Sequence, residues 1–188
     1  MKPLLFLSAA TLLLTATAAH ARLGETEGQS QQRYGQPRED LAVPSDKPLM
    51  LGGVEKTYEY QGFRVRAGFA GGLCLRIEYA RIPENSVPLK LEEAHLAAIL
   101  EGEKGKFTWK EEKPSKQPGV AGDIERALKG ALNVRKWERN DHAKAELALG
   151  LLLKLETKDA DEVEKKLARA MKPVPGQPVK PAPIVPKF

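Results

Sequence analysis

The sequence predicts an α+β fold in which an antiparallel β-sheet, centred on a hairpin over residues 62–81, carries two or three helices on one face. Three observations predict this fold. Several short stretches alternate apolar and polar residues, as half-buried strands do. Other stretches repeat apolar residues at helical spacing. Breaks rich in Gly and Pro separate the two kinds of stretch.

Residues 1–21 are expected to be a signal peptide rather than part of the fold. Lys2 precedes an apolar run of the length of a signal-peptide core, and Ala19-His20-Ala21 fits the small-x-small cleavage pattern. An uncleaved membrane anchor is the alternative, but Thr and Ser dilute the run and a span needs about 20 apolar residues. Cleavage near Ala21 would make the protein periplasmic or extracellular, with no transmembrane span in the mature chain.

Residues 22–171 are expected to form one domain. The sequence has 30 Lys and Arg and 25 Asp and Glu, a net charge of +5, or +4 once Lys2 is removed. This charge is mild and the two signs are interleaved, which argues against a nucleic-acid partner. One cysteine cannot form an internal disulfide, so stability must come from an apolar core.

The first elements are a helix and a loop. Thr26 and Gln29 have the spacing of a capping box, which predicts a helix over 26–34 that ends at Gly35 and Pro37. Residues 36–54 are rich in Pro, Gly, Asp and Lys without a period and are expected to be a loop.

Three antiparallel strands follow, over 56–60, 62–69 and 73–81, with a turn at Gln61-Gly62. Apolar residues are odd-numbered on both long strands, and residues opposite each other must share a face. A three-residue turn, Ala70-Gly71-Gly72, satisfies this condition and a two-residue turn does not. This register places Arg66 opposite Arg76 and Arg64 opposite Glu78.

The polar face of this hairpin holds the residues that suggest a site. Arg64, Arg66 and Arg76 are tentative binding residues for an anion or a partner, and a solvated sheet face is the alternative. Cys74 is expected beside Arg66 and Arg76 as a free thiol, whose pKa these cations would lower. A plain small strand residue opposite Gly68 is the alternative for Cys74.

The second half of the chain predicts further helices and strands. Helices are expected over 90–102, from Asp123 to about 132, and from Asp159 to Met171 with Val163, Leu167 and Ala170 inward. Short strands are expected around Trp109 and Trp137, and a loop over 113–121. Residues 143–157 alternate like one strand, or like two strands separated at Gly150; their helix-forming composition leaves a helix as the alternative. The end, 172–188, has six prolines in seventeen residues and predicts a flexible, disordered tail.

The remaining residues predict no catalytic, cofactor or metal site. His95 lies in a helix and His142 in a turn, and neither has a metal-ligand partner at a usual spacing. No serine lies in a G-x-S-x-G motif. The paired carboxylates lie in charged, helix-start settings where helix capping and solubility explain them.

The segment 24–81 combines a short helix, an aromatic strand and a hairpin, with Gly24, Thr26, Gln29, Gly35, Pro37, Tyr58, Tyr60, Phe69, Gly71 and Ile77 at the characteristic positions. In these residues it resembles the start of SmpA/OmlA (BamE-like) exported bacterial envelope domains. Two features depart from that pattern, because the lipid-attachment cysteine is missing and Ser30 stands where an apolar helix residue is expected. The resemblance is shared with related exported proteins that continue into a helix and a Trp-bearing strand. It implies a non-catalytic binding or assembly domain.

These observations together predict an exported, non-enzymatic protein that binds another envelope protein. A small secreted enzyme or an enzyme inhibitor is the alternative, and it would need a cleft where polar groups converge.

Overall fold

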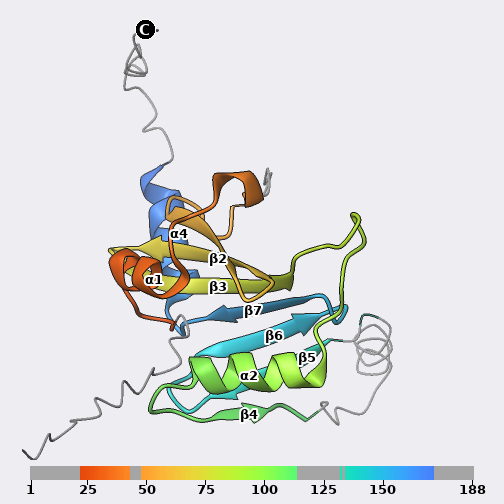
Figure 1. The fold of residues 1–188 in the computed structure, drawn as a ribbon. Coiled ribbons are helices and arrows are strands. Elements are labelled where there is room, and N and C mark those ends of the chain that lie inside the picture. The colour runs from red at the N-terminus through yellow and green to blue at the C-terminus, as the bar shows by residue number, and fades with distance from the viewer. Residues whose placement is uncertain (1–21, 43–47, 114–131, 133, 172–188) are drawn as a thin grey trace, which may run out of the picture.

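A computed structural model describes residues 22–42, 48–113, 132 and 134–171, and it shows a seven-stranded antiparallel sheet with three helices (Figure 1). The strands lie in the order β1-β2-β3-β7-β6-β5-β4. Their bounds are β1 Val54–Tyr60, β2 Phe63–Ala70, β3 Leu73–Arg81, β4 Trp109–Glu111, β5 Arg135–Arg139, β6 Lys144–Ala148 and β7 Leu152–Glu156. The helices are α1 Glu27–Tyr34, α2 Glu93–Glu103 and α4 Ala160–Ala170, with a short 3-10 turn, η1, over Glu39–Leu41.

These elements confirm most of the expected strands and helices. Thr26 caps α1, and its side chain and that of Gln29 form the reciprocal bonds of a capping box. The expected strands around Trp109 and Trp137 are β4 and β5. The segments expected to be a signal peptide and a flexible tail, and nearly all of the expected helix from Asp123 and of the expected 113–121 loop, lie outside the described residues.

The turn between β2 and β3 differs from the expected one. Gly71 and Gly72 form a two-residue turn with φ of 60° and 81°, a left-handed conformation that glycine adopts without strain. Ala70 lies opposite Leu73 and Phe69 opposite Cys74, but the register then shifts so that Gly68 lies opposite Arg76. Leu75 is therefore an extra residue of β3, a β-bulge. Beyond the bulge, odd-numbered residues of β2 again lie opposite odd-numbered residues of β3. The sequence predicts this odd-to-odd pairing through a three-residue turn instead.

Because of this bulge, two of the predicted residue pairs are wrong. Arg66 lies opposite Glu78 rather than Arg76, and Arg64 lies opposite Ala80 rather than Glu78. Before the bulge, the start of β3 pairs with the N-terminal segment, because Cys74 donates to the Glu25 carbonyl and Gly24 donates to the Cys74 carbonyl, both at 2.7 Å.

Residues 143–157 form two strands, which was one of the predicted alternatives. Ala148 lies opposite Leu152, so Leu149, Gly150 and Leu151 form a three-residue turn. Gly150 has a φ of 68°. A three-residue turn keeps odd residues opposite odd residues, and the alternation therefore continues unbroken from one strand to the next.

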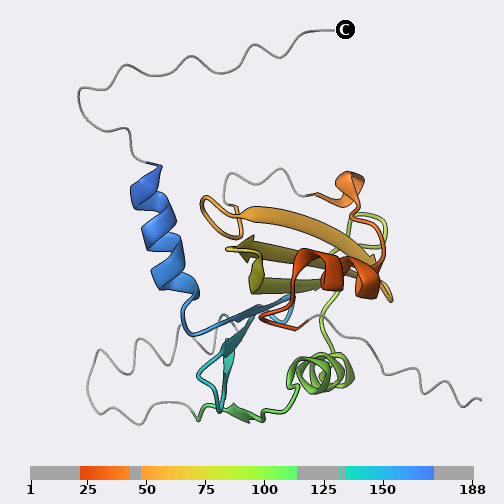
Figure 2. The same cartoon turned by 90° about the vertical axis from the view of Figure 1, so that its left-hand side faces the viewer.

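The core lies between one face of the sheet and two helices. Buried residues of the strands, including Val65, Ile77 and Leu155, pack against Tyr34 of α1 and Leu96 of α2. Figures 1 and 2 show α1 and α2 on this face and α4 on the opposite side of the sheet. Two helices therefore share one face, as expected, and the third does not.

Helix α4 packs loosely against the polar face. Only Ala160 is buried in it, Val163 and Leu167 are half-buried, and Ala170 is exposed, although the sequence predicted all of the last three as inward. Its neighbour is the loop before β1, where Leu49 and Met50 are buried over Gly68. A Cβ on Gly68 would lie 3.3 Å from the Met50 Cβ, so the loop lies close against the backbone of Gly68. Among the described helices, none is long and apolar enough to cross a membrane.

Candidate functional site

Arg76 anchors α4 to the sheet instead of facing an external partner. It is 5% exposed, its guanidinium pairs with Glu156 at 3.3 Å, and it also pairs with Asp161 and Glu164 of α4. Its Nη1 donates to the Leu49 carbonyl at 3.2 Å. Burial acts against the charged form, but these carboxylates outweigh it and raise the pKa of Arg76.

Arg66 is also occupied by carboxylates of the sheet. It bonds to Glu55 at 2.8 Å and to Glu78 at 2.7 Å, and its side chain is 12% exposed. Arg64 is half-buried and makes no ion pair with another described residue. Burial, aided by the neighbouring charge of Arg66, lowers the pKa of Arg64. The structure therefore separates the three arginines into different environments.

Cys74 lies in the core and not on the polar face beside the arginines. Because Leu75 forms the bulge, Cys74 lies opposite Phe69 and on its apolar side, where it is fully buried. Burial, together with the charges of Glu103 and Glu25, raises the pKa of the Cys74 thiol. This is the opposite of the shift expected from neighbouring arginines. Cys74 is free, but it is a thiol kept in its neutral form.

The two histidines have local roles. His95 accepts a hydrogen bond from the Glu92 amide at 3.2 Å, at the start of α2, and stacks edge-on against Phe63. His142 lies in the β5–β6 turn with its Nδ1 2.9 Å from a Glu138 carboxylate oxygen, and both side chains are largely exposed. His142 and Glu138 line an open depression of about 780 Å³ beside β4. In the described ranges, no three His, Cys, Asp or Glu side chains are grouped to hold a metal ion.

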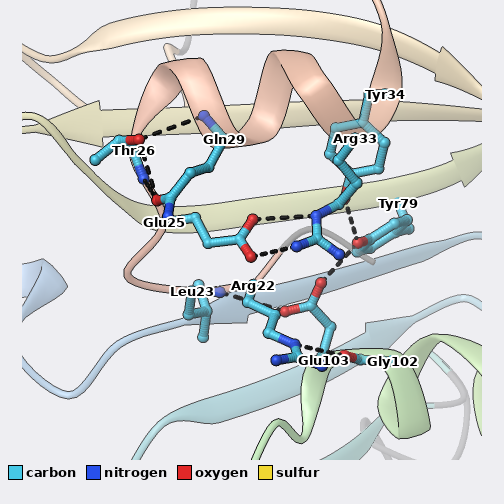
Figure 3. A network of polar contacts seen from close by, with 10 residues as sticks. All are labelled: Arg22, Leu23, Glu25, Thr26, Gln29, Arg33, Tyr34, Tyr79, Gly102 and Glu103. Carbon is cyan, nitrogen blue, oxygen red and sulfur yellow. Dashed lines mark hydrogen bonds and ion pairs between the residues drawn. The ribbon is translucent and has the colours of Figure 1, made fainter. Parts of the chain in front are cut away.

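A buried polar network, which the sequence did not reveal, joins α1, β3 and the end of α2 (Figure 3). The Tyr34 and Tyr79 hydroxyls are 2.8 Å apart, and the Tyr79 hydroxyl donates to the Glu103 carboxylate at 2.8 Å. The Leu23 amide donates to the other Glu103 oxygen at 3.4 Å. Burial raises the pKa of Glu103 to about 8, and it also raises the pKa of Tyr79.

One signal in the sequence could have located Glu103. Leu96, Ile99 and Glu103 are three and four residues apart and therefore lie on the inward face of α2. The expected helix ended at residue 102, which left Glu103 in a loop. An extension by one residue would have placed a carboxylate on the apolar stripe.

The polar face of the sheet carries a regular pattern of charges, here named the charge lattice. Four strands each contain a cation, an apolar residue and a glutamate in sequence, and the apolar residues Ile77, Leu155, Ala145 and Trp137 lie opposite one another in successive strands. Because neighbouring strands are antiparallel, each cation lies opposite a glutamate. The first row of the lattice is Arg66, Glu78, Lys154, Glu146 and Lys136, and the second is Arg76, Glu156, Lys144, Glu138 and Lys110.

The lattice has different environments at its two ends. At the end formed by β2 and β3, α4 and the loop before β1 bury Arg76. Over β5, β6 and β7, Glu138, Lys144 and Glu146 are exposed, and the surface has a depression of about 490 Å³. Lys136 pairs with Glu146 at 2.8 Å, and Lys154 pairs with Glu156 at 3.0 Å. This part is a hollowed, nearly neutral surface with alternating charges.

Comparisons with known proteins identify no relative: no family model matches the chain, and no curated protein or solved structure matches it.

Proposed function

We propose that this chain is an exported, non-catalytic module that binds another protein of the cell envelope through the charge lattice over β5, β6 and β7. The observation that carries the proposal is the regular alternation of exposed and half-buried cations and glutamates around the 490 Å³ depression. Export is proposed from residues 1–21, and the envelope from the resemblance of residues 24–81 to BamE-like domains.

The placement of the reactive side chains supports a non-catalytic role. Cys74 is buried in its neutral form, His95 caps a helix, and Arg76 holds α4. The best arrangement for the alternative, a small enzyme or inhibitor, is the Glu138–His142 pair beside β4. Both side chains are exposed to water, whereas a catalytic pair gains from a desolvated site that separates the two pKa values. Binding is therefore the better proposal.

The chemistry of the lattice determines the kind of partner. A surface with both signs in alternation attracts neither polyanions nor polycations strongly, because its neighbouring charges cancel at a distance. It favours a protein surface with its own charges in complementary positions, where the pattern sets register and specificity more than raw affinity. Such binding weakens as the salt concentration rises.

A paired-alanine experiment tests this proposal. Lys144→Ala with Glu146→Ala removes one exposed charge of each sign from the lattice and leaves the net charge unchanged. Glu162→Ala with Lys166→Ala is the matched control, since it removes an exposed pair, 2.8 Å apart, from α4. All three forms of the protein, immobilised at equal amounts, are used to capture proteins from envelope extracts at low and high salt.

The expected result is one defined envelope protein that the unaltered protein and the α4 control retain and the lattice variant loses. Its retention should decrease at high salt. The proposal fails if no form retains a partner, or if the lattice variant retains the same partner as strongly as the control does.

A further inference from the structure

The buried carboxylate of Glu103 makes no ion pair with any cationic side chain of the described residues. Its fully buried side chain bonds to the Tyr79 hydroxyl and the Leu23 amide. Arg139 lies close, but its Nη1 donates to the Glu103 backbone carbonyl at 2.7 Å, and its other nitrogens bond to Asp141. A further positive charge close to a buried carboxylate would favour its anionic form.

Arg22 is held directly beside this carboxylate. The next residue, Leu23, donates its amide to Glu103, and the Arg22 Nε donates to the Gly102 carbonyl at 3.4 Å. Figure 3 shows Arg22 and Leu23 against the end of α2, with the Glu103 carboxylate between them and Tyr79. Adjacent backbone nitrogens are about 3–4 Å apart, so the Arg22 nitrogen lies roughly 3–7 Å from the carboxylate oxygen.

We propose that removal of residues 1–21 makes the α-ammonium group of Arg22 the counter-ion of Glu103. This inference rests on the proposed export. A signal peptidase hydrolyses the Ala21–Arg22 peptide bond: water supplies a hydroxyl to the Ala21 carbonyl carbon and a hydrogen to the Arg22 nitrogen. The new amine takes up a proton near neutral pH, because α-amino groups have a pKa of about 7.7–8.0. Cleavage of the Ala21–Arg22 bond would thereby place a positive charge next to a buried carboxylate of the folded domain.

The charged groups around Glu103 do not already neutralise its carboxylate. The groups that face it are the Tyr79 and Tyr34 hydroxyls, the Cys74 thiol, the Arg139–Asp141 pair and the Glu25–Arg33 pair. The Arg22 guanidinium also lies at this end of α2, where its Nε donates to the Gly102 carbonyl and not to the Glu103 carboxylate. Arg139 and Arg33 are each paired with another carboxylate, and Glu25 adds a repulsive negative charge. A terminal ammonium would supply the missing cation.

The stability of the protein should then depend on pH in a way that reveals the pair. With residue 21 attached, the pKa of Glu103 is raised to about 8, far above the value of about 4.3 in an unfolded chain. The folded state then binds the extra proton, so the stability falls as the pH rises from about 4.5 to 8. An ammonium beside Glu103 lowers its pKa and reduces this fall.

The test compares two full-length precursors that are exported and purified after processing. One is unaltered, and the other has Gly-Ser inserted between Ala21 and Arg22, which moves the ammonium two residues away. Intact mass and N-terminal sequencing establish the first residue of each mature chain. Thermal unfolding midpoints are measured from pH 5 to 8.5, and the same pair is made with Glu103→Gln. The pKa of the terminal amine is measured separately from the pH dependence of its acylation.

The unaltered protein should begin at Arg22 and should unfold about 2–4 °C higher than the insertion variant near pH 7. The difference should shrink toward pH 5, where Glu103 is protonated, and it should vanish with Glu103→Gln. The terminal amine should have a pKa above 8 only in the unaltered protein.

Three results overturn the inference in different ways. If residues 1–21 are retained, both the proposed cleavable signal and the counter-ion are wrong. If cleavage occurs at another peptide bond, the counter-ion alone is wrong. If cleavage occurs before Arg22 but the midpoints coincide at every pH and the amine has an ordinary pKa, the counter-ion alone is wrong and the proposed function stands.

Discussion

Leu75 is the extra residue of the bulge in β3, and it determines on which face Cys74 lies. The alternation of apolar residues correctly predicted the inward face for Val65, Ile77 and Tyr79. It failed for Leu73, which is 45% exposed, and for Cys74, which is fully buried. The alternation could not reveal the bulge. The start of β3 pairs with residues 24–26, and this pairing involves a segment about 50 residues away in the sequence.

The burial of Cys74 predicts that its thiol reacts slowly with thiol reagents. Because its pKa is raised and the side chain is inaccessible, a thiol reagent should modify it only after local or global unfolding. Labelling is followed by mass spectrometry in the native protein and in urea, with a small thiol peptide as the control. Native labelling within a factor of about ten of the peptide rate would contradict the proposed core position.

Ser30 is the second residue whose environment matters. It is fully buried in α1, and its hydroxyl has no hydrogen-bond partner among the described residues. A desolvated, unpaired hydroxyl costs about 1–3 kcal/mol. Ser30→Ala should therefore raise the free energy of unfolding by about 1 kcal/mol, measured by urea denaturation. A loss of stability of similar size would show that the hydroxyl is satisfied.

At the scale of elements, the four strands that carry the repeated charge pattern lie where the sequence predicted strands, but their arrangement was not predictable. The repeated sequence of cation, apolar residue and glutamate is visible at Arg76, Lys136, Lys144 and Lys154. Which charges lie opposite one another depends on the strand order, which places β7 between β3 and β6. If one strand shifted by two residues along its neighbour, its apolar face would still point inward, but like charges would lie opposite each other. The charge lattice therefore helps to specify the register of the strands.

We expect helix α4 to depend on Arg76 more than on apolar packing, because Ala160 is its only buried residue and Arg76 pairs with two of its carboxylates. Arg76→Gln should leave Asp161 and Glu164 without their shared cation and should release α4 from the sheet. Amide hydrogen exchange in residues 160–170 should accelerate by at least about tenfold, while β2 and β3 stay protected. Lys166→Gln, which removes only an exposed pair, should change exchange little. Unchanged protection of α4 in Arg76→Gln would show that apolar contacts suffice to hold it.

At the scale of the whole molecule, the two faces of the sheet have different roles. Helices α1 and α2 close the apolar face, and the Tyr34–Tyr79–Glu103 network ties both helices to β3. The polar face is closed by α4 at one end, and its exposed charges surround a depression at the other. The fold class followed from local patterns, but this division required contacts between residues such as Arg76 and Glu164, 88 positions apart.

The central proposal is that the charge lattice contacts an envelope protein, and photo-crosslinking in the intact cells that make the protein tests it most directly. A photoreactive amino acid replaces Lys144 of the lattice in one strain and Lys166 of α4 in another. We expect one discrete adduct of constant mass from position 144 and none from position 166. The proposal is contradicted if position 144 gives no adduct, or if both positions give the same products.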